Sequence, residues 1–266
     1  MIYRSVALYA AYFAQFLKAR LAYRADFAAS LLSNLVGGAA GVLFVFFLMD
    51  GKTITNLRGW SREEILLIYG FSTIAMALFS FVSFNLFRFG DRYIVQGNFD
   101  RVLLRPLNSL CQVLFETFNI ESLGTLAVGL AVVSYAGRRL GIAFTAMDYL
   151  WLLLGSLSGA LILLAVFIFV ASLSFHFEDR LGVSAPVYNL INFSRYPLPI
   201  FHPVIQFILQ WIIPFAFSAF YPAAYFLKRP ELLPYCYAVP AVAVVSLAIA
   251  GTAWSFGVRR YCSTGS

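Results

Sequence analysis

Charged side chains are scarce in this sequence of 266 residues. Lys, Arg, Asp and Glu together make up 12% of it, hydrophobic residues make up 61%, and the mean hydropathy is +0.82. Soluble domains usually contain about 25% charged residues. The composition therefore excludes an ordinary soluble domain, and we expect an integral membrane protein.

Cysteine is also rare, and its spacing excludes further classes. Cys111, Cys236 and Cys262 are far apart and include no CxxC pair, which argues against a disulfide framework and against a cysteine metal site. The apolar runs approach the roughly 20 residues that a helix needs to cross a bilayer, unlike the alternating segments of a β-barrel. Lys and Arg are scattered at the ends of these runs, which is typical of lipid headgroup contact and not of nucleic-acid binding.

We predict an all-α fold with six transmembrane helices. Residues 1–26 mix aromatic residues with cations and are expected to form an amphipathic elbow helix in the membrane interface; a tail with no fixed place is the alternative. Residues 27–266 form the transmembrane domain. Its predicted spans cover about residues 27–49, 65–87, 119–136, 149–175, 182–196 and 235–257.

Local signals refine this outline. Ser61 and Glu64 have the spacing of a capping box at the start of the second span. Glycines in the first and fourth spans would let other helices approach closely. Prolines interrupt residues 201–227, for which we predict a re-entrant helical pair in the outer leaflet, shielded by protein.

The number of spans sets the orientation of the chain. Six spans place both termini on one side, and a small majority of the Lys and Arg residues favours the cytoplasm for that side. No internal repeat is visible, which argues against transporters that are built from two repeated halves.

Catalytic motifs are missing as well. The sequence has no HExxH, no GxSxG and no Gly-rich phosphate loop. His176 and His202 are its two histidines, and Glu116 and Glu121 stand near the start of the third span, where an ion-paired role competes with a proton relay. We expect no catalytic residue, metal or cofactor on this chain, so any energy that it uses must come from an ion gradient or from a nucleotide-binding partner.

The stretch after the second span is unusually polar for this chain. Gly97 is a predicted break, and Phe99, Val102, Leu103 and Leu107 follow at spacings that favour one face of a short helix. Such a helix can insert an apolar face into a groove on a soluble partner while its charges fix the register. The alternative is an interfacial helix that contacts only lipid.

The residues resemble a known family, the permease subunits of type-2 exporters in the ATP-binding cassette (ABC) superfamily. The similarity is carried by the elbow at residues 2–24, by "GNFDRVLLRPLN" at 97–108, and by the proline-rich "RYPLPIFHPVIQFILQWIIPFAFSAFYPAAYFL" at 195–227. It implies a cytoplasmic ABC ATPase dimer that carries the ATP and Mg²⁺, and a second permease chain in a homodimer or a heterodimer. It also implies a coupling helix at residues 96–107 and a bacterial cytoplasmic (inner) membrane location.

Two sets of residues follow from this hypothesis. A cargo path is expected between the first, second and fifth spans, for an amphiphilic or hydrophobic small molecule or lipid. A membrane-embedded lipid-modifying enzyme and an ion-coupled carrier remain the alternatives. The proposed ATPase-coupling residues are Gln96, Phe99, Asp100, Arg101, Leu103, Leu104 and Arg105, and the proposed path residues are Phe201, Phe207, Trp211, Phe217 and Tyr221.

Overall fold

The computed structural model describes residues 13–262 except residues 16, 19, 21, 50–55 and 178–181. The regular elements of this part are helices, which confirms the prediction of an all-α membrane protein. The long ones are α2 (Arg24–Leu48), α3 (Arg62–Phe87), α6 (Ser122–Arg139), α7 (Ala146–Phe177) and α11 (Leu233–Arg260).

Four helical stretches of the described residues are long and apolar enough to cross a membrane. They are Arg24–Leu48, Arg62–Val95, Ala146–Phe177 and Pro230–Arg260. The predicted third and fifth spans do not meet this criterion. The third is α6, which has 18 residues and two arginines in its last turn.

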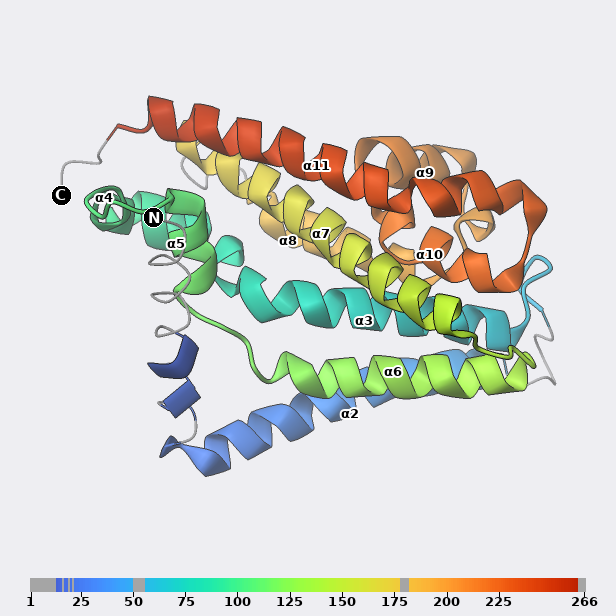
Figure 1. Ribbon diagram of the computed structural model, residues 1–266. Coiled ribbons are helices and arrows are strands. Elements are labelled where there is room, and N and C mark those ends of the chain that lie inside the picture. The colour runs from blue at the N-terminus through green and yellow to red at the C-terminus, as the bar shows by residue number, and fades with distance from the viewer. Residues whose placement is uncertain are drawn as a thin grey trace.

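The long helices run side by side along one axis (Figure 1). Helix α3 lies in the middle of the core. In the most apolar part of Arg62–Val95, which contains α3, 72% of the residues are buried, against 6% in α2 and 17% in Pro230–Arg260, which contains α11. Helices α6 and α7 pack on α3, and α11 packs on α7. Helices α2 and α11 therefore present apolar side chains at the periphery, where a membrane protein meets lipid.

One end of the bundle carries two short helices, α4 (Asn98–Leu103) and α5 (Ser109–Phe115). Figure 1 shows that α2 starts and α11 finishes at this same end, which we call the α4 end. The turn at residues 56–60 and the start of α11 lie at the opposite end.

The start of α2 bears on the predicted elbow. Residues 1–12 lie outside the described residues, and α2 already begins at Arg24, three residues before the predicted span. Ahead of it, Arg20 forms an ion pair of 2.8 Å with Glu121 at the start of α6. This contact ties the residues before α2 to the third long helix.

Two predicted local features are confirmed. The Ser61 hydroxyl accepts a hydrogen bond from the Glu64 backbone N–H at 3.2 Å, and the Glu64 carboxylate accepts one from the Ser61 N–H at 2.8 Å. The small residues also allow close approach: a Cβ at Gly41 would overlap the Tyr69 hydroxyl, and one at Gly159 would overlap the Ser218 carbonyl oxygen.

The fifth predicted span is helical but short. It consists of α8 (Ser184–Leu190) and the 3₁₀ segment η2 (Ile191–Arg195). At the rise of these helix types they span only about 20 Å, less than a bilayer core of about 30 Å. Pro197 and Pro199 follow directly and prevent the helix from continuing.

The rest of the broken region is a series of short helices. Its members are η3 (Leu198–Ile200), α9 (Pro203–Phe207), η4 (Ile208–Ile212), η5 (Phe215–Ser218), α10 (Phe220–Ala224), η6 (Tyr225–Leu227) and η7 (Pro230–Leu232). Figure 1 places α9 and α10 toward the opposite end of the bundle from α4. This series leads from the end of η2 to the start of α11.

Candidate functional site

The predicted coupling segment begins with a change of helix type. Helix α3 passes into a π-helical turn, η1 (Gly90–Val95), and Gly97 then adopts a left-handed conformation with φ of 70°. This conformation suits glycine because it lacks a Cβ. Helix α4 follows at once and is therefore shorter than the predicted helix 96–107.

Phe99 holds α4 against the bundle. Its side chain is fully buried, and its ring centroid lies 5.0 Å from those of Phe175 and Tyr261 and 6.1 Å from that of Trp254. The prediction that Phe99 fills a groove on a partner is therefore wrong for this conformation. An apolar pattern marks the buried face of a short helix but does not tell whether its own chain or another protein covers that face.

The outer surface of the segment consists of other predicted residues. Leu103 is 45% exposed and Leu104 85% exposed. Asp100 is half-buried beside Tyr261. The burial of the Tyr261 hydroxyl, and then the nearby Asp100 carboxylate, raise the pKa of Tyr261 to about 12. Gln96, Arg101 and Arg105 are exposed as well.

A polar network joins this segment to α3. Arg92 donates hydrogen bonds to Glu116 at 2.9 Å and to the Asn85 side chain at 3.1 Å, and the Tyr93 hydroxyl also donates to Glu116. The Asn85 amide donates to the Val113 carbonyl of α5 at 2.7 Å. Glu116 is thus ion-paired, and so is Glu121, in keeping with the ion-paired interpretation of both carboxylates.

The proposed path residues fall into two groups. Phe207 and Trp211 are 57% and 62% exposed on α9 and η4. Phe217 and Tyr221 are 2% and 3% exposed, with ring centroids 4.6 Å apart. The last two lie in the core and line no open path here, whereas Phe201 is half-buried against Phe193 at 5.3 Å.

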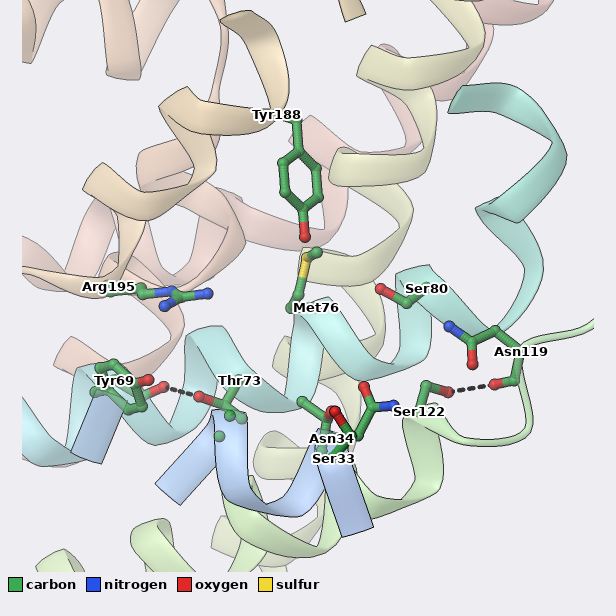
Figure 2. A pocket seen from close by; sticks show the side chains of 13 residues that line it. Ser33, Asn34, Tyr69, Thr73, Met76, Ser80, Asn119, Ser122, Tyr188 and Arg195 are labelled. Atoms are coloured by element: carbon green, nitrogen blue, oxygen red, sulfur yellow. Dashed lines mark hydrogen bonds between the residues drawn. The ribbon is translucent and has the colours of Figure 1, made fainter. Parts of the chain in front are cut away.

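A cavity of about 350 Å³ lies at mid-height of the long helices. Ser33 and Asn34 of α2 line it on one side, and Tyr69, Thr73, Met76 and Ser80 of α3 on another. The rest of the lining consists of Gly37, Gly38, Asn119, Ser122, Thr125, Tyr188 and Arg195. Figure 2 shows the Arg195 guanidinium, the Tyr188 hydroxyl and the Ser80 hydroxyl directed toward the same space.

The cavity is polar although the surrounding helices are apolar. Thr73 and Ser122 donate to carbonyl oxygens of Tyr69 and Asn119 at 2.8 and 2.7 Å. Arg195 lies over the Tyr69 ring, 5.5 Å from its centroid. Inside the hydrocarbon region of a membrane, ionisable side chains are costly and are treated as functional-site candidates by default.

The sequence located the elements of this cavity but not its residues. The cavity is lined by α2, α3 and α8–η2, which correspond to the first, second and fifth predicted spans, and also by the start of α6, the third. Asn34 and Arg195, polar residues inside apolar runs, were the available signals. The sequence does not single out either residue, because one polar residue in an apolar run does not tell whether its side chain faces a cavity, another helix or lipid.

Both histidines make structural contacts in the described part of the chain. The exposed His202 ring accepts a hydrogen bond from the Val204 N–H at 3.4 Å and so caps α9. His176 stacks on Phe256, with centroids 5.8 Å apart. No group of three or more His, Cys, Asp or Glu suited to a metal ion occurs in this part of the chain.

The four long apolar helices and the apolar periphery of the bundle fit a multi-pass membrane protein. The family model described as ABC-2 family transporter protein matches residues 37–265. The chain belongs to this family, which supports a permease component of an ABC transporter. Searches of curated proteins and of solved structures found no match.

Proposed function

We propose that this chain is the permease subunit of an ATP-driven exporter in the bacterial cytoplasmic membrane. The chain crosses the membrane six times, with both termini and the α4 end in the cytoplasm. Residues 182–196 begin the fifth crossing, and the re-entrant pair at 201–227 follows it in the outer leaflet. Its cargo is an amphiphilic or hydrophobic small molecule or lipid.

A separate ABC ATPase dimer, which holds ATP and Mg²⁺, docks on the α4 end. The observation that carries this proposal is the exposed Leu104, 85% accessible between Arg101 and Arg105 at the C-terminal end of α4, which Phe99 anchors to the bundle. An apolar side chain between exposed cations fits a groove on a soluble partner better than it fits water. Leu103 and Gln96 border the same surface.

The anchoring of α4 gives a route for mechanical coupling. Phe99 touches rings from α7 and α11. Arg92 of η1, the segment just before α4, pairs with Glu116 and donates a hydrogen bond to Asn85 of α3. A push on α4 is thereby transferred to three long helices as rigid bodies. ATP drives the transition because its binding to the partner favours the outward-open form.

A second permease chain, identical or related, completes the transporter. Helix α2 offers an exposed apolar surface that includes Leu32, Val36 and Phe44, at 61%, 59% and 58% exposure. We expect one part of this surface to contact the second chain and the rest to contact lipid.

Replacement of Leu104 by Asp tests the docking surface. We expect Leu104→Asp to abolish co-purification of the ATPase and ATP-dependent transport, because it places a charge in an apolar groove, while the melting temperature stays unchanged. Met147→Asp is the matched control, since Met147 is 64% exposed at the opposite end. Normal ATPase binding by Leu104→Asp would refute the docking surface, and transport by the chain without any ATPase would refute the proposed function.

A further inference from the structure

The polar cavity described above lies next to a second compartment. A cavity of about 400 Å³ is lined by Ser83, Phe84 and Phe87 of α3 together with Ser184 and Ala185 of α8. Ser80, Asn119 and Tyr188 line both cavities, so the two are adjacent. The second compartment lies nearer the α4 end, because Phe84 and Phe87 are at the C-terminal end of α3.

The charges around the polar compartment have one sign. Arg195 is half-buried at its wall, and no carboxylate of the described residues forms an ion pair with it. Neither Asp nor Glu occurs among the residues that line the compartment. Glu121, next to Ser122 in the chain, is already paired with Arg20 at 2.8 Å.

The neutral lining groups suit an anion as well. Ser33 and Ser80 carry hydroxyls that make no hydrogen bond to another described residue. A hydroxyl can donate to an anionic oxygen, and guanidinium can bind a phosphate or a carboxylate through two parallel hydrogen bonds. Figure 2 shows Arg195 and Ser80 facing the compartment from different sides.

We propose that these two compartments form the cargo site of the permease and that they select an anionic amphiphile. The acidic headgroup, a phosphate or a carboxylate, binds Arg195 and the surrounding hydroxyls at mid-height of the helices. The hydrocarbon part lies along Phe84, Phe87 and Tyr188. This inference rests on the proposed transport function and adds the chemical class of its substrate.

The charge preference gives a direct binding test. The full chain in phosphatidylcholine nanodiscs is titrated with dodecyl phosphate and with dodecyltrimethylammonium, two amphiphiles with the same alkyl chain and opposite charge. We expect dodecyl phosphate to bind at least tenfold more tightly. Equal affinities, or tighter binding of the cation, would overturn the proposal.

Variants of Arg195 locate the site. Arg195→Gln should weaken binding of dodecyl phosphate at least tenfold and leave that of the cation unchanged, and Arg195→Lys should give a smaller loss because it keeps the charge but not the planar fork. Arg138→Gln is the matched control, because Arg138 is exposed at the end of α6 and outside both compartments. Wild-type affinity in Arg195→Gln would overturn the proposal.

A second variant keeps the test valid if changes at Arg195 impair folding. Ser33 is exposed on α2, so Ser33→Leu leaves the core intact while it narrows the polar compartment. We expect at least a fivefold loss of dodecyl phosphate affinity, and unchanged binding would count against the site. These results are independent of ATPase docking, so failure here leaves the permease function standing and failure of the Leu104 experiment leaves the binding site standing.

Discussion

Arg229 shows how a single side chain joins distant parts of this chain. Its guanidinium donates to Glu64, 165 positions earlier, at 2.8 Å and lies 3.8 Å from the centroid of the Trp60 ring. Trp60 in turn packs edge-on against Phe220 at 5.5 Å. One arginine therefore connects the start of α3, the turn before it and the segment that precedes α11.

Loss of this arginine should weaken that end of the bundle. We expect Arg229→Ala to lower the melting temperature of the purified chain by several degrees, because a partly buried ion pair and a cation–π contact together contribute about 1–3 kcal/mol. Thermal unfolding in detergent measures the effect. Arg138→Ala, at an exposed site, should leave the melting temperature unchanged, and an equal loss in both variants would contradict the assignment.

The helices depend on glycine where they cross. Glycines of α3 and α6 meet at one crossing: a Cβ at Gly129 would lie 3.0 Å from the Ile74 backbone nitrogen, and one at Gly70 would lie 3.1 Å from that of Val133. Gly159 of α7 meets the Ser218 carbonyl of η5 even more closely. Small residues indicated close packing in the sequence, but they did not identify the partner, and Gly37 has no atom near its missing Cβ.

An alanine at one of these crossings should separate the elements. We expect Gly159→Ala to destabilise the chain and to loosen η5, because the new methyl group meets backbone that cannot rotate away. Gly251→Ala is the matched control in α11, where nothing lies within 4 Å, and it should be neutral or stabilising. Comparable melting temperatures for the two variants would contradict the close contact between α7 and η5.

At the scale of the whole molecule, the two ends of the bundle differ in character. Leu104 is exposed at the α4 end, where α2 starts and α11 finishes, and Met147 is exposed at the opposite end. If the fold spans a membrane as proposed, these two residues lie on opposite sides of it. The proposed orientation places Leu104 in the cytoplasm.

Cysteine labelling tests this orientation. Cys111 and Cys262 are replaced by Ser and the buried Cys236 by Ala, and Leu104→Cys or Met147→Cys is then added to this background. We expect a membrane-impermeant maleimide to label Met147→Cys in intact cells and Leu104→Cys only after the membrane is opened. Labelling of Leu104→Cys in intact cells would reverse the topology, and labelling of both would show that the two ends share a side.

The sequence by itself determined the membrane class, the positions of the long helices, the Ser61 cap and the similarity to ABC permeases, since hydropathy, caps and motifs are local along the chain. The tertiary structure alone decided that Phe99 is internal, that Phe217 and Tyr221 lie in the core and that Arg195 meets Ser33 and Ser80 around one cavity. The physical reason is that lipid is as apolar as a protein interior. The lipid-facing and protein-facing sides of these helices therefore carry the same kinds of residue, and only the packed structure distinguishes them.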